Sequence, residues 1–242
     1  MTSDLSKTVA IPRGRITDPS QVYVVIAAFN EDNALAAVVA PLVASSYSVV
    51  VVDDGSSDDT AKVARRAGAH VLSHPMNRGQ GAALQTGIDY ALQSGAQFVV
   101  TFDADGQHDH NDIASSIGAL QRSGAEIALG SRFLGTATGL TMAKRLTLKA
   151  AIAFTNFRAG LKLTDAHNGF RVLTSNAARE LRISQNRMAH ASEIIEQIAT
   201  KKISYIEVPV TITYSAYSRR KGQRISNVPN IIFDLLLRRF GR

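Results

Sequence analysis

The sequence predicts an α/β protein with a mostly parallel central sheet flanked by helices, followed by a basic helical extension at the C-terminus. Over residues 1–131, short valine- and isoleucine-rich runs alternate with longer segments whose apolar residues recur every three or four positions. The first pattern is typical of buried strands and the second of amphipathic helices. Strand–helix alternation builds a parallel sheet with right-handed crossovers and helices on both faces. After residue 132 the alternation breaks and basic residues accumulate.

Five strands and four helices are expected in residues 21–131. The helices are predicted from apolar stripes such as the one that runs from Leu35 to Leu42. Residues that favour helix N-caps precede three of them, so we expect caps at Asn30, at Ser56 or Ser57, and at Asn111. The runs that predict the strands cover residues 22–26, 48–52, 69–72, 99–102 and 125–129.

The loop Gly79-Gln80-Gly81 precedes the third helix. It resembles a dinucleotide fingerprint only superficially, because Leu84 stands where the third glycine belongs. We interpret it as a loop that presents backbone N–H groups to a phosphate, with Arg78 nearby. A plain helix-entry turn is the alternative.

The second half begins with a helix predicted over residues 142–162. Lys144, Arg145, Lys149 and Arg158 interrupt its apolar residues, so it either lies on an anionic membrane surface or packs as a core helix whose basic side chains reach solvent. A short strand before Thr174, a helix around residues 194–198 and a strand over 203–210 follow. Pro209 marks an edge or a bend in that last strand.

Acidic residues stand at the ends of the predicted strands. Asp103 and Asp105 follow the strand 99–102 and point to the same side, because side chains alternate along an extended chain. Open parallel sheets bind ligands outside the carboxyl ends of their strands. Paired carboxylates there suit Mg²⁺ or Mn²⁺, although a polar turn is the alternative for this pair taken alone. Asp54 occupies the same position after the second strand, and Glu31 either does so after the first or complements a helix dipole.

Composition and charge narrow the functional classes. The 242 residues contain no cysteine, which excludes disulfides, thiolate zinc sites and thiol nucleophiles. The net charge of +7 divides into −6 for residues 1–131 and +13 for residues 132–242. The acidic first half predicts binding of a metal ion, and the basic second half predicts binding of an anionic partner. No nucleic-acid motif is visible, so nucleic acid is not expected as a partner. Without a signal peptide or an apolar run of about 18 residues, we expect a cytoplasmic protein, in peripheral contact with the membrane if it touches one.

Five motifs occur in the order of a known family: Ala27-Ala28-Phe29-Asn30-Glu31, Asp53-Asp54-Gly55-Ser56, Asn77-Arg78-Gly79, Asp103-Ala104-Asp105-Gly106-Gln107-His108 and Gly130-Ser131-Arg132-Phe133. The chain therefore resembles family 2 glycosyltransferases of the GT-A fold, above all the dolichol- or polyprenol-phosphate mannosyl- and glucosyltransferase-like group. The resemblance implies a single catalytic domain over residues 21–214, with a nucleotide-binding half (21–131) and an acceptor half (132–214). Residues 1–20 are expected to form a flexible lead-in, and 215–242 a basic loop and an amphipathic helix.

The resemblance also implies roles for individual residues. Asp103, Asp105 and Gln107 would hold the divalent cation, Mg²⁺ or Mn²⁺, and Asp165 would lie near the acceptor as a catalytic residue together with Arg132. Ser215 departs from the arginine that the lipid-phosphate enzymes tend to carry, and Lys221-Gly222-Gln223 retains only part of their later pattern. The residues expected to bind the nucleotide sugar are Ala27, Phe29, Asn30, Glu31, Asp54, Asp103, Ala104, Arg132 and Lys221.

The activity implied is metal-dependent, inverting transfer of a hexose from a nucleotide sugar to a polyprenyl phosphate or another membrane-associated or cell-envelope glycan acceptor. A lipid phosphate is already an anion and needs no base. For a hydroxyl acceptor Asp165 is the candidate base, with His167 and His190 as alternatives. A small membrane protein is a conceivable partner. The competing interpretations are a non-catalytic sugar-nucleotide-binding or membrane-docked scaffold, and a phosphohydrolase with an aspartate nucleophile.

Overall fold

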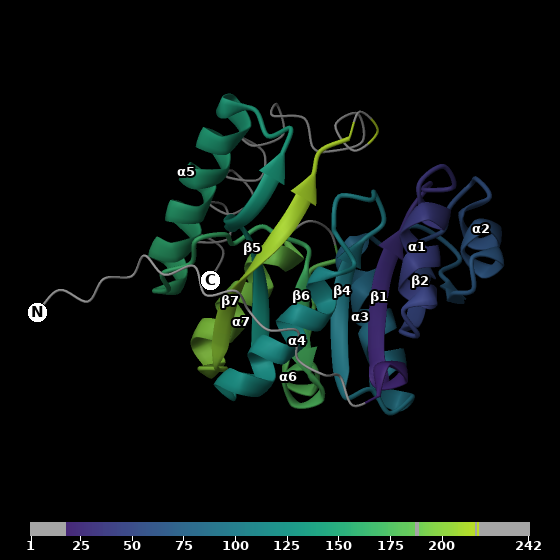
Figure 1. Cartoon of the computed structure of the whole chain (residues 1–242), viewed down its shortest axis with the longest axis horizontal. Helices are drawn as coiled ribbons and strands as arrows, with labels where there is room; N and C mark the ends of the chain where they lie inside the picture. Colours follow the sequence, from purple (N-terminus) through teal and green to yellow (C-terminus); the bar gives the residue numbers. More distant parts are fainter. Residues whose placement is uncertain (1–17, 187–188, 216, 218–242) are drawn as a thin grey trace, which may run out of the picture.

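The computed structural model describes residues 18–186, 189–215 and 217, and its centre is a seven-stranded sheet with the order β3-β2-β1-β4-β6-β5-β7 (Figure 1). Every strand runs parallel to its neighbours except β6, which is antiparallel to both β4 and β5. The prediction of a mostly parallel sheet is therefore confirmed. The strands are β1 (Val22–Ala28), β2 (Ser48–Asp53), β3 (His70–Ser73), β4 (Phe98–Asp103), β5 (Ile127–Thr138), β6 (Arg171–Thr174) and β7 (Tyr205–Thr213).

Helices cover both faces of this sheet. One apolar core joins α1, α2 and α4 to the sheet, and another joins α3, α5, α6 and α7 to its opposite face. Neighbouring residues of β1 show the division, because Val24 and Ile26 belong to the first core and Val25 to the second. The helices are α1 (Leu35–Ala44), α2 (Thr60–Arg66), α3 (Gln80–Gln93), α4 (Asp112–Ser123), α5 (Met142–Ala159), α6 (Ser175–Glu180) and α7 (His190–Lys201), preceded by the 3₁₀ turn Pro19–Gln21.

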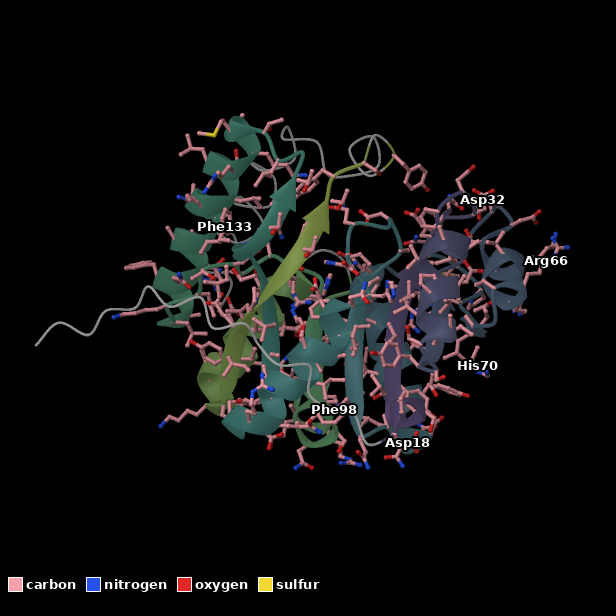
Figure 2. The ribbon with its side chains drawn as sticks, viewed as in Figure 1. Asp18, Asp32, Arg66, His70, Phe98 and Phe133 are labelled. Atoms are coloured by element: carbon pink, nitrogen blue, oxygen red, sulfur yellow. The ribbon has the colours of Figure 1, made fainter. Side chains whose placement is uncertain are left out.

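The direction of the strands places the acidic loops at one edge of the sheet. Asp18 and Phe98, which precede or begin strands, lie at one edge, and Asp32, which follows β1, lies at the other (Figure 2). β1 and β4 are paired in register from Val22 with Phe98 to Ala27 with Asp103, so their carboxyl ends are side by side. The loops after β1, β2 and β4 therefore share this edge.

Strand β5 is longer than the predicted run 125–129. It continues to Thr138 and pairs with β7 across a register shift between Ser131 and Thr136. A side chain at Gly135 would place its Cβ 2.2 Å from the carbonyl oxygen of Val210, so glycine permits this close approach. Pro209 lies at the shift on the edge strand β7, as predicted.

The predicted helix caps are wrong in their chemistry. Asn111 occupies the N-cap position of α4, but its side chain bonds Asp109 instead of a helix N–H. Asn30 and Ser56 bond across the two neighbouring loops, from the Asn30 N–H to the Ser56 hydroxyl at 2.9 Å. This bond therefore joins two loops that are distant in sequence, whereas the bond of Asn111 is local. Short helix α6 and the antiparallel direction of β6 were not predicted at all.

Candidate active site

Asp103 ends β4 and lies at the centre of the acidic edge. Its side chain is 30% exposed, while its carboxylate accepts a hydrogen bond from His108 Nε2 at 2.9 Å and lies 3.5 Å from Gln80 Nε2. A Cβ on Gly169 would lie 2.3 Å from both carboxylate oxygens. The turn before β6 thus packs its backbone directly against Asp103, which only glycine allows.

The two carboxylates of the Asp-x-Asp pair differ in their electrostatics. Burial alone would raise the pKa of Asp103, but the hydrogen bond from His108 and the positive charges of His108, Arg171 and His190 outweigh it and lower that pKa. Burial and the negative charge of Asp103 raise the pKa of Asp105. The two carboxylates therefore repel each other, and a bound divalent cation would reduce this repulsion.

The residues present fit such a cation. Gln107 donates its backbone N–H to Asp105 at 3.1 Å, and its side-chain amide contacts the other oxygen of the same carboxylate. Carboxylate and amide oxygens are the ligands that Mg²⁺ and Mn²⁺ prefer, and rotation of the amide exchanges its nitrogen for its oxygen. Within residues 18–186, 189–215 and 217 no three His, Cys, Asp or Glu side chains gather into a metal cluster. A cation held here would therefore depend on Asp103, Asp105, Gln107 and ligand oxygens.

Arg132, on β5, is held by a buried hydrogen-bond network. Its Nε lies 2.6 Å from Asp165, Nη1 2.5 Å from the Tyr214 hydroxyl and Nη2 3.1 Å from the carbonyl oxygen of His167. Burial opposes the charged guanidinium, but the charges and hydrogen bonds of Asp165 and Tyr214 raise the Arg132 pKa. The network therefore holds the Arg132 guanidinium in one orientation without any ligand.

Asp165 is buried, whereas a general base must be able to reach the acceptor. Its side chain has no exposed surface, and it accepts bonds from both Nε and the backbone N–H of Arg132. In this arrangement Asp165 orients Arg132. A base must reach the acceptor proton, so the predicted role as a base stays a prediction without geometric support.

Lys144 is a candidate site residue on α5, the helix for which the sequence left a membrane-surface and a core position open. Its Nζ lies 4.3 Å from the centre of the Tyr214 ring, a cation–π arrangement. Burial and the charge of Arg132 lower the Lys144 pKa, while Asp105 opposes this shift. The N-terminus of α5 thus brings a second cation towards the Asp-x-Asp pair. No local pattern distinguishes Lys144 from Arg145, so the sequence alone offered no signal.

Arg171 is a further candidate site residue, to which the sequence analysis gave no role. It begins β6 opposite Thr101 of β4 and is 3% exposed. Burial lowers its pKa, and the negative charges of Asp103 and Asp165 oppose that shift. Arg171 therefore links the two acidic centres of the site electrostatically. Its position directly after Gly169 and Phe170, a few residues beyond Asp165, was the available signal.

The loop after β1 presents the predicted nucleotide-binding residues in different ways. Phe29 is 44% exposed, whereas Ala104, from the loop after β4, is buried in the core. Asn30 adopts a positive φ of 55° and accepts a bond from the Ser57 N–H at 2.9 Å. The Glu31 carboxylate accepts a bond from the Tyr217 hydroxyl at 2.6 Å. Ala27 pairs with Asp103 at the end of the β1–β4 ladder, and Lys221, the segment predicted to form a C-terminal helix and residues 1–17 lie outside the described residues.

The loop after β2 holds Asp54, and the loop after β3 was expected to bind a phosphate; the second of these expectations needs correction. The Asp54 carboxylate points inwards, where it accepts bonds from the N–H groups of Arg78 at 2.9 Å and Gly79 at 2.7 Å. The N–H groups of Gly81 and Ala82 donate to the carbonyl oxygen of Asn186. The loop 79–81 therefore does not present these N–H groups to a phosphate, because protein acceptors already occupy them. Contact of Asp54 with a nucleotide stays a prediction.

No helix in the described part of the chain combines the length and apolarity that crossing a bilayer requires.

Comparison with known proteins agrees with this architecture. A UDP-N-acetylglucosamine–dolichyl-phosphate N-acetylglucosaminyltransferase from Methanococcus voltae is 28% identical over 91% of this chain and 97% of its own length. A polyprenol monophosphomannose synthase from Mycolicibacterium smegmatis is 27% identical over 83% of each chain. Glucosyl-3-phosphoglycerate synthase from Mycobacterium tuberculosis, solved with Mn²⁺, uridine diphosphate and phosphoglyceric acid, superposes with a TM-score of 0.66 at 18% identity over 91% of this chain and 78% of that one. The likeness to the solved structure shows the GT-A fold. Because the model of glycosyl transferase family 2 matches residues 23–182, more than half of the sequence, the chain belongs to that family and is a glycosyltransferase.

Proposed function

We propose that this glycosyltransferase moves a hexose from a nucleotide sugar to a polyprenyl phosphate, with Mg²⁺ or Mn²⁺ and inversion at the anomeric carbon. The supporting observation is the meeting of two kinds of charge at one edge of the sheet. Asp103 and Asp105 supply negative charge, and the cations Arg132 and Lys144 approach from β5 and α5. Relatives that act on dolichyl phosphate or polyprenol monophosphate support the acceptor class.

The donor half would work by electrostatic preorganisation. Asp103, Asp105 and Gln107 would hold the cation, which when bound neutralises the diphosphate as the sugar leaves. His108 and the Gly169 turn hold Asp103 in place before any ligand arrives. Arg132, already oriented by Asp165, adds a fixed positive charge. These groups need little rearrangement in the transition state, which is the source of their catalytic effect.

The acceptor class is supported by a cavity beside α5. This cavity has a volume of about 380 Å³ and is lined by α5, by Phe133 on β5 and by Thr164. Figure 2 shows Phe133 beside α5. The cations Arg145 and Lys149 line it together with apolar Ile152 and Ala153. A phosphate with an apolar chain matches this combination. Because a phosphate is already charged, attack on the sugar needs no general base, and the inward position of Asp165 is no obstacle.

Helix α5 also offers a surface for peripheral membrane contact. It stands at the opposite end of the molecule from α2 (Figure 1). Met142, Leu146 and Phe157 are 77%, 72% and 84% exposed on it, and Arg145 and Lys149 lie among them. Exposed apolar residues beside cations suit the interface of an anionic bilayer. We propose that the enzyme acts in the cytoplasm, at the inner face of the membrane.

The test is a donor screen with purified protein. UDP- and GDP-sugars labelled in the sugar are incubated with Mn²⁺ and with vesicles that do or do not contain a polyprenyl phosphate. We expect release of nucleoside diphosphate and entry of label into lipid, both dependent on the lipid phosphate. Transfer to a glycan hydroxyl without any lipid phosphate would contradict the acceptor assignment and return Asp165 to the role of base. Binding of donors without turnover in any arm would favour the non-catalytic scaffold.

A further inference from the structure

His74 follows β3, and its side chain connects this strand to the end of β2 and to α3. Its side chain is 8% exposed, and Nδ1 lies 2.7 Å from the Asp54 carboxylate at the end of β2. Nε2 lies 3.0 Å from the hydroxyl of Thr86 on α3, and the single hydrogen of that hydroxyl can point either to Nε2 or to the carbonyl oxygen of Ala82, which is also 3.0 Å away. Since a carboxylate only accepts, Nδ1 carries the hydrogen. Both ring nitrogens are therefore satisfied, and the imidazole is fixed in its plane.

Asp54, which is held by His74, in turn holds the loop before α3 through hydrogen bonds. The oxygen that binds His74 also accepts from the Arg78 N–H, and the second oxygen accepts from the Gly79 N–H. Gly55 supports the same loop from the other side, because a Cβ there would lie 2.6 Å from the carbonyl carbon of Met76. The path of residues 76–79 is thus determined by the Asp54–Gly55 turn.

The loop leads directly to the metal-binding edge. Gln80 is the first residue of α3, and its Nε2 lies 3.5 Å from Asp103 Oδ1. The next residue, Gly81, is held by the carbonyl oxygen of Asn186, and a Cβ there would lie 2.0 Å from the carbonyl oxygen of Gln185. A shift of the loop would therefore move Gln80 relative to Asp103, while the rest of α3 stays anchored.

We propose that His74 is a positioning residue of the donor site, which acts through Asp54 to hold Arg78 and Gln80 where the nucleoside diphosphate binds. This inference rests on the proposed function. It assigns Asp54 to the support of the loop, in place of direct contact with the nucleotide, and it gives His74 a role that its sequence position did not suggest. Groups that orient ligand-binding residues commonly change affinity by about 10- to 100-fold when removed.

The experiment compares His74→Phe with His74→Asn. Phenylalanine keeps the ring but removes both hydrogen bonds, whereas the asparagine amide can replace the Nδ1 donor to Asp54. With UDP and GDP as probes in the presence of Mn²⁺, we expect Kd to rise about 10-fold in His74→Phe and to return to within about two-fold in His74→Asn. With the donor sugar, KM should rise while kcat at saturation changes little.

Two controls separate positioning from loss of stability. Ile198→Ala removes a buried side chain on α7 and should lower the melting temperature without changing the Kd for the nucleotide. Thr86→Val removes the second partner of His74 and should have a smaller effect on Kd than His74→Phe. An unchanged Kd in folded His74→Phe, or a failure of His74→Asn to recover it, overturns the inference.

Amide hydrogen exchange distinguishes this inference from the proposed function. The Arg78 and Gly79 amides should exchange faster in His74→Phe than in the wild type, because their acceptor is no longer held. Faster exchange with an unchanged Kd would make His74 merely structural. If the wild type binds neither UDP nor GDP, both the proposed function and the role of His74 are wrong. If the wild type binds and His74→Phe binds with the same Kd, only the role of His74 is wrong.

Discussion

Asp165 and Arg132 form a buried ion pair in which the carboxylate accepts bonds from the backbone N–H at 3.1 Å and from Nε at 2.6 Å of the same arginine. Both side chains are almost closed to solvent. The guanidinium is further held by Tyr214 and by the carbonyl oxygen of His167. The Arg132 guanidinium is therefore oriented before any ligand binds, and its position depends on Asp165.

Replacing Asp165 with Ala should strongly destabilise the protein, because it leaves Arg132 buried without its counter-charge. We expect a loss of about 3–5 kcal/mol in the free energy of unfolding, measured by urea denaturation. The matched control is Asp59→Ala, which breaks the exposed pair with Lys62 and should cost less than about 1 kcal/mol. Equal effects of the two substitutions would show that the Asp165–Arg132 pair does not support the fold.

Replacing Asp105 with Ala should abolish metal-dependent turnover. Mn²⁺ should raise the melting temperature of the wild type, because cation binding relieves the repulsion between Asp103 and Asp105 and stabilises only the folded state. This rise should disappear in Asp105→Ala and persist in Asp109→Asn, a nearby exposed carboxylate. Thermal melts with and without Mn²⁺ and EDTA provide the measurement. A full Mn²⁺ response in Asp105→Ala would rule out this carboxylate as a ligand.

Replacing Gly169 with Ala should displace the Asp103 carboxylate, since the added methyl would lie 2.3 Å from both of its oxygens. We expect turnover to fall by about 100-fold or more, as misplacement of about 1 Å can do. Gly160→Ala is the control, because Gly160 is the C-cap of α5, has a φ of +67° and has open space around its Cβ. It should cost about 1 kcal/mol in stability and leave turnover unchanged. Normal activity in Gly169→Ala would mean that the turn moves freely away from Asp103.

Replacing Lys144 with Met should weaken use of the acceptor. Methionine keeps the length and apolar packing over Tyr214 but removes the charge. We expect KM for the polyprenyl phosphate to rise about 10-fold, the size of one charge-assisted contact, with little change in KM for the donor. Lys62→Met, at an exposed position on α2, is the control. A rise confined to the donor KM would place Lys144 on the diphosphate instead.

His167 should make stability sensitive to acid. Burial is the largest influence on its pKa and, with the charges of Arg171 and Arg132, lowers that pKa despite the opposing charge of Asp165. The unfolded chain therefore binds a proton near pH 6.5 before the folded protein does, so the free energy of unfolding falls as the pH drops below about 6.5, by at most about 1.4 kcal/mol per pH unit. His167→Gln should reduce this slope in urea denaturation between pH 7.5 and 5.5. An identical slope in the variant would assign the effect to other groups.

Much of the first half could be predicted from local pattern. The valine-rich runs are buried strands because each is apolar on both faces, as a sheet covered by helices requires. The Asp-x-Asp pair lies at the edge where parallel strands bind ligands, because the alternation of side chains and the direction of the strands are properties of the chain itself. The resemblance to the family rested on five such local motifs, and the comparisons confirmed it.

The prediction failed where the partners are distant in sequence. Two of the three expected caps failed because the Asn30 and Ser56–Ser57 loops, 26 and 27 residues apart, bond to each other, whereas Asn111 bonds the nearby Asp109. The antiparallel strand β6 is only four residues long, and its direction follows from pairing with two neighbours at once. A phosphate-binding loop was expected at Gly79, yet Asp54, 25 residues earlier, accepts its N–H.

By itself, the sequence determined the class of fold, the family and the acidic edge of the sheet, since hydrophobic periodicity and short motifs are carried by neighbouring residues. Only the tertiary structure decided how the charges are used. It turned Asp54 and Asp165 inwards as supports, brought Lys144 to Tyr214 and set Gly169 against Asp103. A carboxylate looks the same in the sequence whether it faces a ligand or a neighbouring N–H group, and the difference arises from packing between segments that are far apart along the chain.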